Sequence, residues 1–290
     1  MKYVIAGSTS GTGHAVLKRF ALKVDVQDMT CIVRDHSDIS VHKELGIKVV
    51  QADITNAKSY QKLLDQETVF IDMTHPKYYD VSIRAITEKN VQRAFFITTT
   101  GIFSEYNQFS EIYKVNEKRI VDSGITYTIL RPSMIYGHLR DRNMSRLIKF
   151  LNSYPVFPLF GSGKSLMQPV FVDDLADGIV SAIFSETSEN QAYNLCGSNA
   201  ISYKNLIETI LYILDRKVHL LNIPLNIATF GAKLGFFIPK FPITEEQVLR
   251  LQEDKVFDIS KSISELNYEP REFIDGIAIE INQMRSANLI

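Results

Sequence analysis

The stretch KYVIAGSTSGTGHAVLKRF, residues 2–20, decides the fold of this chain. Its apolar run Tyr3–Ala6 is too short for a helix and stops at a glycine, which predicts a buried parallel strand. Apolar residues then recur at helical spacing from Ala15 to Phe20, so we expect a helix after the turn. The turn itself contains three glycines: Gly7, Gly11 and Gly13.

A strand, a glycine-rich turn and a helix in this order can bind a pyrophosphate at the helix N-terminus. The unpaired N–H groups of the first helical turn face the anion, and glycine lets the backbone approach it closely. A tight turn without a ligand is the alternative for such a loop. The residues that we expect to contact a cofactor here are Gly7, Thr9, Ser10, Gly11, Thr12 and Gly13.

Composition bounds the class of protein. The 290 residues suffice for one large α/β domain, or for a nucleotide-binding domain with a smaller lobe. A net charge of -1 gives no electrostatic footprint for nucleic acid or an anionic membrane. The spacing of cysteine and histidine suggests no metal, and no apolar run is long enough to span a membrane. A strand at the N-terminus and two distant cysteines predict a cytoplasmic protein without a signal peptide.

The second predicted strand, Met29–Val33, ends where dinucleotide-binding folds read the adenosine ribose. An arginine at this point neutralises the 2′-phosphate of NADP, whereas an acidic residue accepts hydrogen bonds from the free 2′-hydroxyl of NAD. Arg34 comes first and Asp35 second, so we predict NADP rather than NAD. The alternative is that Arg34 is solvated and Asp35 turns inward for NAD.

Polar residues follow two of the later predicted strands, at the sheet edge where ligands bind. His75 follows the strand predicted over residues 68–73, and it is either a proton carrier or a turn residue before Pro76. Thr98, Thr99 and Thr100 end the strand predicted over residues 94–98, and they either bind a ligand or only cap the next turn. Further strands are expected over residues 47–50 and 127–130.

Several stretches in order resemble the extended and atypical short-chain dehydrogenase/reductases, a group that includes NAD-dependent epimerases and dehydratases. They are Gly7-x-x-Ser10-x-x-Gly13, Arg131-Pro-x-x-x-Tyr-Gly137, Pro169-Val-x-Val-Asp-Asp-x-Ala176, and the ending Asp258-x-Ser-Lys261 with Glu265-Leu-Asn-Tyr-Glu-Pro270. The resemblance implies an α/β fold, a doubly wound parallel Rossmann sheet with a smaller C-terminal substrate lobe. We expect one unit over residues 1–290, with a dinucleotide-binding core near 1–135 and a substrate lobe near 136–290 that returns elements to the core.

The resemblance also implies roles for single residues. Asp53 and Ile54 would contact the adenine, although Asp53 or Thr55 could also cap a helix over residues 57–64. Thr99, with Thr100 as the next candidate, would hydrogen-bond a substrate carbonyl. Further cofactor contacts would come from Thr74, His75, Thr98, Pro132, Ser133 and Met134.

Family enzymes carry a Tyr-x-x-x-Lys pair, in which the lysine holds the nicotinamide ribose and lowers the pKa of the tyrosine. In the helix predicted over residues 109–123, Lys114 matches the lysine best, but Ser110 stands where the tyrosine belongs. A shift by one residue would put Tyr113 at the lysine and Phe109 at the tyrosine. We therefore expect Thr99, Lys114 and Tyr113 at the reacting centre, with Lys114 also contacting the cofactor.

The second half of the chain predicts shorter elements. We expect an amphipathic helix over residues 143–152, a helix breaker at Pro155–Pro158, and a helix to Phe184 capped by Asp173 or Asp174. The apolar run Pro224–Lys240 predicts a helix that packs the small lobe, or else a lid for a hydrophobic or quinone-like substrate, or a contact surface.

Three functions are consistent with these patterns. The first is an NADP-dependent oxidoreductase that acts on a small, fairly apolar carbonyl compound. The second is an NAD(P)-binding protein without turnover, similar to redox-sensing regulators or to the nucleotide-binding accessory subunit of respiratory complex I. The third is an NAD-dependent epimerase or dehydratase, although the missing arginine near Gln168 disfavours a nucleotide-sugar. A homodimer through the helices near residues 77–89 and 109–123 stays open.

Overall fold

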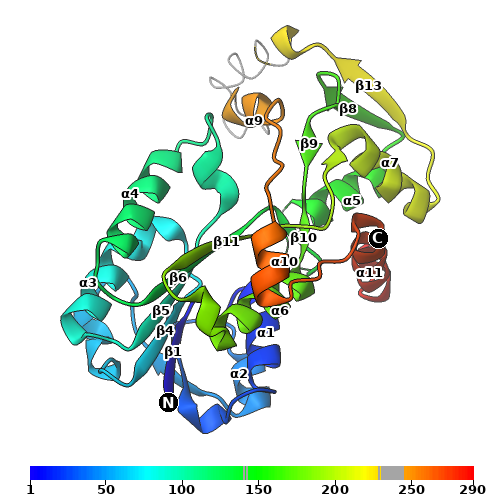
Figure 1. The fold of residues 1–290 in the computed structure, drawn as a ribbon. Coiled ribbons are helices and arrows are strands. Elements are labelled where there is room, and N and C mark those ends of the chain that lie inside the picture. The colour runs from blue at the N-terminus through cyan, green and yellow to red at the C-terminus, as the bar shows by residue number, and fades with distance from the viewer. Residues whose placement is uncertain (140, 142, 228, 230–244) are drawn as a thin grey trace.

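The computed structural model describes residues 1–139, 141, 143–227, 229 and 245–290. Its centre is a seven-stranded sheet in the order β11-β6-β5-β4-β1-β2-β3, and every neighbouring pair is parallel (Figure 1). The predicted doubly wound α/β fold is therefore confirmed. The strands are β1 Lys2–Ala6, β2 Met29–Val33, β3 Lys48–Gln51, β4 Thr68–Asp72, β5 Arg93–Ile97, β6 Tyr127–Pro132 and β11 Gln191–Leu195.

Helices cover both faces of this sheet because successive strand side chains point to opposite sides. In β1, Tyr3 and Ile5 enter the core that also contains Phe20 of α1, whereas Val4 enters the core that contains Ile83 of α3. The helices on the first face are α1 Gly11–Phe20, α2 Ser40–Leu45 and α6 Val172–Phe184, and those on the second are α3 Tyr79–Lys89 and α4 Ser110–Val121.

A third hydrophobic cluster fills a C-terminal lobe beside the sheet (Figure 1). Its helices are α5 Met144–Ser153, α7 Tyr203–Leu214 and α11 Phe273–Ser286. Three two-stranded sheets belong to this region: β7 Ile135–Tyr136 with β10 Val170–Phe171, β8 Val156–Phe160 with β13 His219–Ile223, and β9 Leu166–Met167 with β12 Ile201–Ser202. Two further helices are α9 Glu245–Arg250 and α10 Ser260–Leu266.

One local prediction was wrong. Residues 57–64 form two short 3₁₀ turns, η2 Ala57–Ser59 and η3 Gln61–Leu63, instead of one α-helix, because no side-chain cap starts a helix there. The expected helix breaker Pro155–Pro158 is confirmed, because α5 ends at Ser153, and its residues 156–158 begin strand β8. Pro158 is tolerated because β8 pairs only with β13, so one side of the strand needs no backbone donor.

The expected capping by Asp173 or Asp174 is also replaced by another arrangement. The N-cap of α6 is Phe171, and no side chain caps it. Asp174 instead binds Arg271, whose Nη2 lies 2.7 Å from Oδ1, and Asp173 lies 3.4 Å from Nη1 of Arg19. Both carboxylates still lie in the first turn, where they favour the helix dipole.

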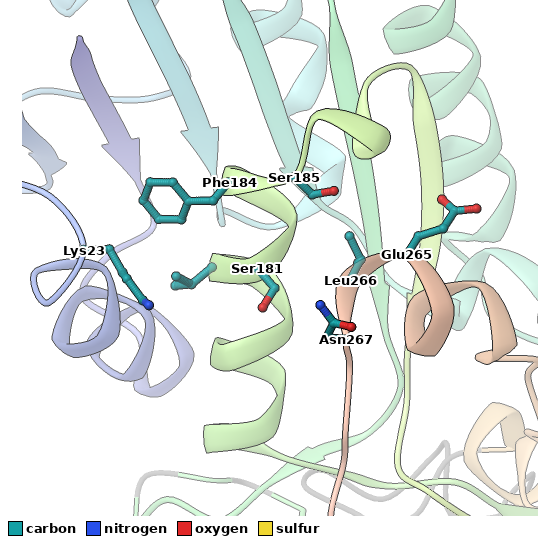
Figure 2. Close-up of a pocket in the computed structure, with 8 residues that line it drawn as sticks. Lys23, Ser181, Phe184, Ser185, Glu265, Leu266 and Asn267 are labelled. Atoms are coloured by element: carbon teal, nitrogen blue, oxygen red, sulfur yellow. The ribbon is translucent and has the colours of Figure 1, made fainter.

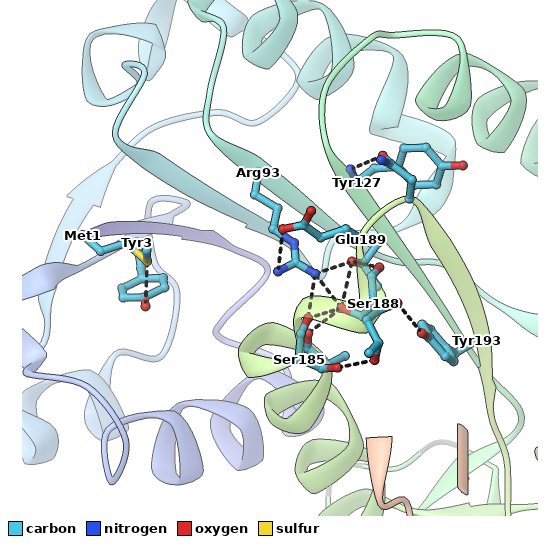
Figure 3. Close-up of polar contacts among 12 residues, drawn as sticks. Met1, Tyr3, Arg93, Tyr127, Ser185, Ser188, Glu189 and Tyr193 are labelled. Carbon is cyan, nitrogen blue, oxygen red and sulfur yellow. Dashed lines mark hydrogen bonds and ion pairs between the residues drawn. The ribbon is translucent and has the colours of Figure 1, made fainter. Parts of the chain in front are cut away.

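At the edge where the strands begin, Arg93 joins β5 to the connection between α6 and β11 (Figure 3). Its Nη2 donates to Thr128 Oγ1 at 3.2 Å and to Ser188 Oγ at 2.5 Å. Within the described residues, no helix is long and apolar enough to cross a membrane. Most of the apolar run Pro224–Lys240 lies outside the described residues.

Candidate functional site

The glycine turn between β1 and α1 lies tightly against neighbouring backbone. Gly7 has φ of 80°, and a Cβ on it would lie 2.4 Å from the carbonyl carbon of Met73, directly after β4. A Cβ on Gly13 would lie 2.6 Å from the carbonyl oxygen of Gly7. Only glycine fits both positions, so the N-terminus of α1 is held at the carboxyl edge of the sheet.

Ser10 shapes this turn from inside. It is the N-cap of α1, because the N–H of Gly13 donates to Ser10 Oγ at 2.9 Å. The same hydroxyl donates to the carbonyl oxygen of Gly7 at 3.1 Å. Thr9 and Thr12 on either side are half-buried. The Ser10 hydroxyl therefore stabilises the turn. Ser10 would affect cofactor binding by holding the turn in this conformation.

The residues expected at the adenosine end lie after β2 and β3. Arg34 and Asp35 are exposed, and Asp35 Oδ2 lies 3.3 Å from Nε2 of His36. Asp53 accepts hydrogen bonds from the N–H and the hydroxyl of Thr55 at 2.9 and 2.8 Å. These bonds, and then the charge of Arg34, lower the pKa of the Asp53 carboxyl. Ile54 is buried in the core cluster beside the sheet.

The loop after β4 brings a histidine to the same edge. Thr74 donates from its hydroxyl and its N–H to Asp72 Oδ1, at 2.6 and 2.9 Å. His75 Nδ1 accepts from the N–H of Lys77 at 3.3 Å, and His75 Nε2 lies 3.5 Å from the phenol oxygen of Tyr113. Burial, followed by the charge of Lys77, lowers the pKa of His75.

Helix α4 presents a different face to the sheet from the one that we expected. Its buried side chains are Ser110, Tyr113, Asn116, Glu117 and Ile120. Lys114 lies on the solvent side, where its half-exposed Nζ pairs with Glu111 at 2.7 Å. This placement differs from the expectation that Lys114 reaches the ribose, and the buried polar residue one turn beyond Tyr113 is Glu117.

The ends of β5 and β6 are joined by Glu117. Thr98 donates to Glu117 Oε1 at 2.8 Å, and Arg131 Nε lies 3.0 Å from Oε1 and 3.1 Å from Oε2. Thr99 Oγ1 accepts from the N–H of Gly101 at 3.0 Å and so caps the next turn, while buried Thr100 donates to the carbonyl of Pro132 at 3.2 Å. Both functions of the threonine run that we considered thus stay open for Thr99.

The backbone after Pro132 leaves the sheet and joins it to the lobe. Ser133 donates its hydroxyl to the carbonyl of Gln168, and the carbonyl of Met134 accepts from the N–H of Val170 at 2.9 Å. Met134 packs, half-buried, against the lobe core. This segment therefore leaves β6 at the carboxyl edge of the sheet and is bonded to the lobe.

Residues 7–149 match the protein family described as NAD(P)H-binding. This part of the chain therefore resembles NAD(P)H-binding domains, and its parallel sheet has the Rossmann-like fold of such proteins. The glycine turn, the loop after β4 and the buried face of α4 all lie within the matched range. We call the carboxyl edge of the sheet, where the glycine turn and the loop after β4 lie, the cofactor edge.

Three known proteins illustrate the similarity. The chain is 24% identical over 224 residues to the mitochondrial NADH dehydrogenase [ubiquinone] 1 alpha subcomplex subunit 9 of Dictyostelium discoideum, covering 71% of this chain and 62% of that protein. It is 21% identical over 308 aligned positions to UDP-glucose 4-epimerase of Vibrio cholerae, covering 92% and 90%. The NADPH-dependent quinone oxidoreductase of Escherichia coli, solved with NADPH, shares the fold with a TM-score of 0.77 and 20% identity, covering 95% and 98%.

Sequence reasoning missed one residue at the cofactor edge. The ring of His138, in the connection after β7, lies against Gly11, where an added Cβ would be 2.7 Å from it. The lobe thus contacts the glycine turn directly. The position follows the Arg131–Gly137 stretch, but nothing in the local pattern indicates a contact with a residue so distant in the chain.

A cavity of about 380 Å³ lies away from this site (Figure 2). It is lined by residues around the C-terminal ends of α1, α6 and α10, among them Lys23, Ser185 and Asn267. These helix ends lie toward the edge where the strands begin. None of the expected cofactor residues lines it, so we do not assign the reaction to this cavity.

Proposed function

We propose that this chain is an NADPH-dependent oxidoreductase that reduces a small, fairly apolar carbonyl compound. The observation that supports this most is the pairing of Tyr113 with His75 at the cofactor edge. Gly7 of the phosphate turn touches the backbone of Met73 and Thr74, and His75 is the next residue. This arrangement supports a role for the Tyr113 phenol as a proton donor near the glycine turn.

The hydrogen bonds of His75 determine which partner donates the proton in the bond between His75 and Tyr113. Because Nδ1 accepts the N–H of Lys77, the neutral ring carries its proton on Nε2 and donates it toward Tyr113. The phenol proton of Tyr113 is then free to be donated to a substrate oxygen. Bound NADPH would supply the hydride.

The pKa shifts of His75 and Tyr113 are compatible with proton donation from Tyr113 to the substrate. Burial keeps His75 neutral near pH 7, and burial raises the pKa of Tyr113, so the phenol stays protonated in the resting state. A forming alkoxide is far more basic than a phenolate, so a weakly acidic phenol still transfers its proton downhill. His75 Nε2–H would then stabilise the phenolate.

The preference for NADPH rests on the adenosine end. Within the described residues Arg34 forms no ion pair, whereas Asp35 lies beside His36. An exposed guanidinium without a partner suits a 2′-phosphate, which arginine binds through two hydrogen bonds.

The test is steady-state oxidation of NADPH by the purified protein with a panel of aldehydes, ketones and quinones. We expect turnover by the wild type, and a loss of about 100-fold or more in kcat for Tyr113→Phe with NADPH affinity within about twofold. Tyr212→Phe is the control, because Tyr212 is 79% exposed on α7. Full activity of Tyr113→Phe, or no turnover of any carbonyl compound by the wild type, would contradict the proposal.

A second candidate function is an NAD(P)-binding protein without turnover. The observation that favours it is the outward direction of Lys114, which leaves Glu117 in place of a lysine on the buried face of α4. The similarity to the Dictyostelium NADH dehydrogenase subunit agrees with this alternative. Tight NADPH binding without oxidation of the cofactor by any carbonyl would favour it.

A further inference from the structure

Residues Glu253–Phe257, between α9 and α10, form a segment that we call the strap. Its first residue holds the loop that follows β5. The Glu253 carboxylate accepts from the hydroxyl of Ser104 at 2.7 and 2.9 Å, and from the N–H groups of Glu105 and Tyr106 at 2.7 and 3.3 Å. One carboxylate thus organises three consecutive residues of the NAD(P)H-binding part.

The rest of the strap is bound to the lobe. Asp254 Oδ1 accepts from the N–H of Leu166 at 2.8 Å, and the N–H of Lys255 donates to the carbonyl of Leu166 at 2.8 Å. The N–H of Phe257 donates to Gln168 Oε1 at 2.8 Å. The strap therefore connects β9 in the lobe to the loop after β5, and its position is fixed on both sides.

This attachment brings two phenylalanines together beside the turn that Thr99 caps. The rings of Phe103 and Phe257 have centroids 5.7 Å apart and an interplanar angle of 33°. Phe103 ends the turn that Thr99 caps, and the guanidinium of Arg131 lies 5.4 Å from its ring. Although it is held by these two contacts, Phe103 remains 52% exposed.

The strap follows helix α9 in the chain. Besides burial, which raises the pKa of Tyr113, the charges of Arg250 and Glu246 in α9 act on this phenol in opposite directions. Phe103 lies on the same turn as Thr99, and Arg131, which contacts its ring, pairs with Glu117 one helical turn from Tyr113 in α4.

We propose that Phe103 and Phe257 form the wall that receives the ring of the substrate, so that the substrate is a carbonyl conjugated to a planar aromatic or quinone ring. This inference rests on the proposed reductase function and narrows its substrate class. Offset or tilted aromatic pairs leave ring faces and edges free for a third ring, and an aliphatic chain cannot use their quadrupoles. The exposed half of Phe103 is the surface that such a ring would cover.

The test uses 1,4-naphthoquinone and hexanal as probes with wild type, Phe103→Leu and Phe257→Leu. Leucine keeps an apolar side chain, so folding is expected to be preserved. In the variants we expect the KM for naphthoquinone to rise about tenfold with kcat within about twofold, and the KM for hexanal to change less than about twofold. Phe184→Leu is the control, because Phe184 is 47% exposed at the opposite edge of the sheet.

A binding measurement separates this inference from the proposed function. Saturation-transfer NMR of naphthoquinone with the protein loaded with NADP⁺, which cannot donate a hydride, reports ring binding without turnover. Binding that is present in the wild type and in Phe184→Leu, and weakened about tenfold in Phe103→Leu and Phe257→Leu, supports the inference even if no turnover occurs. Unchanged binding in those two variants, equal KM changes for both probes, or no binding at all would overturn it.

Discussion

Arg131 donates to both carboxylate oxygens of Glu117, and the side chains of the pair are only 19% and 8% exposed. Removing one partner leaves a buried charge uncompensated. We therefore predict that Glu117→Ala lowers the free energy of unfolding by about 3–5 kcal/mol, measured by urea denaturation. A loss below about 1 kcal/mol would show that this network contributes little.

Lys114→Ala is the matched change on the same helix. The ion pair of Lys114 with Glu111 is solvent-exposed, with side-chain exposures of 53% and 81%, so its loss is expected to cost less than about 1 kcal/mol. NADPH affinity, measured by calorimetry, is expected to change less than about twofold. A tenfold loss of NADPH affinity would show that Lys114 contacts the cofactor after all.

Substitutions at two glycines with positive φ can distinguish the cost of backbone strain from the cost of a steric clash. Gly7 and Gly46 have φ of 80° and 72°, but only Gly7 has atoms within reach of an added Cβ. Gly46→Ala should lower the free energy of unfolding by about 1–2 kcal/mol and keep NADPH affinity. Gly7→Ala should cost clearly more and abolish measurable NADPH binding, because the turn must move away from Met73. Equal effects of the two substitutions would refute the close packing of the turn.

Glu280 predicts a pH dependence of stability. Burial, with the Asp141 carboxylate adding to it and the bond from the Gly137 N–H opposing it, raises the pKa of Glu280 to about 8 from its ordinary 4.5. Between these values the folded protein holds a proton that the unfolded chain releases. The stabilisation that protonated Glu280 gives the folded protein is therefore complete below the pKa of Glu280 in the unfolded chain. It is lost as the pH rises toward about 8.

Glu280→Gln cannot ionise and keeps a carbonyl acceptor for Gly137. We expect its free energy of unfolding to fall less between about pH 5 and pH 8 than that of the wild type, by on the order of 3 kcal/mol. Urea denaturation at the two pH values measures this, and exposed Glu208→Gln serves as the control. Parallel pH profiles of wild type and Glu280→Gln would disprove the raised pKa.

The parallel sheet could be predicted from sequence because its strands are locally encoded. The run Met29–Val33 is apolar except for Thr30 and is strand β2 with those bounds. The glycine turn is likewise a local feature, since Gly7 and Gly13 are required by contacts within the first β–α unit and its neighbouring strand.

The face of α4 could not be predicted from its apolar residues. Ile112 and Val115 are 41% and 48% exposed, whereas Ser110 and Glu117 are buried. Glu117 is stabilised inside by Arg131, which lies 14 residues further along the chain. The strand containing Pro158 and the contacts of Glu253 with Ser104 depend on still more distant partners, so no short window of sequence reveals them.

The measurement that tests the account most directly is calorimetric titration of the purified protein with NADPH and NADH in parallel. If Arg34 reads the 2′-phosphate at the cofactor edge, NADPH binds more than tenfold tighter than NADH, a difference above about 1.4 kcal/mol, and Arg34→Gln removes this preference. Equal affinities, tighter binding of NADH, or no binding of either cofactor would contradict it.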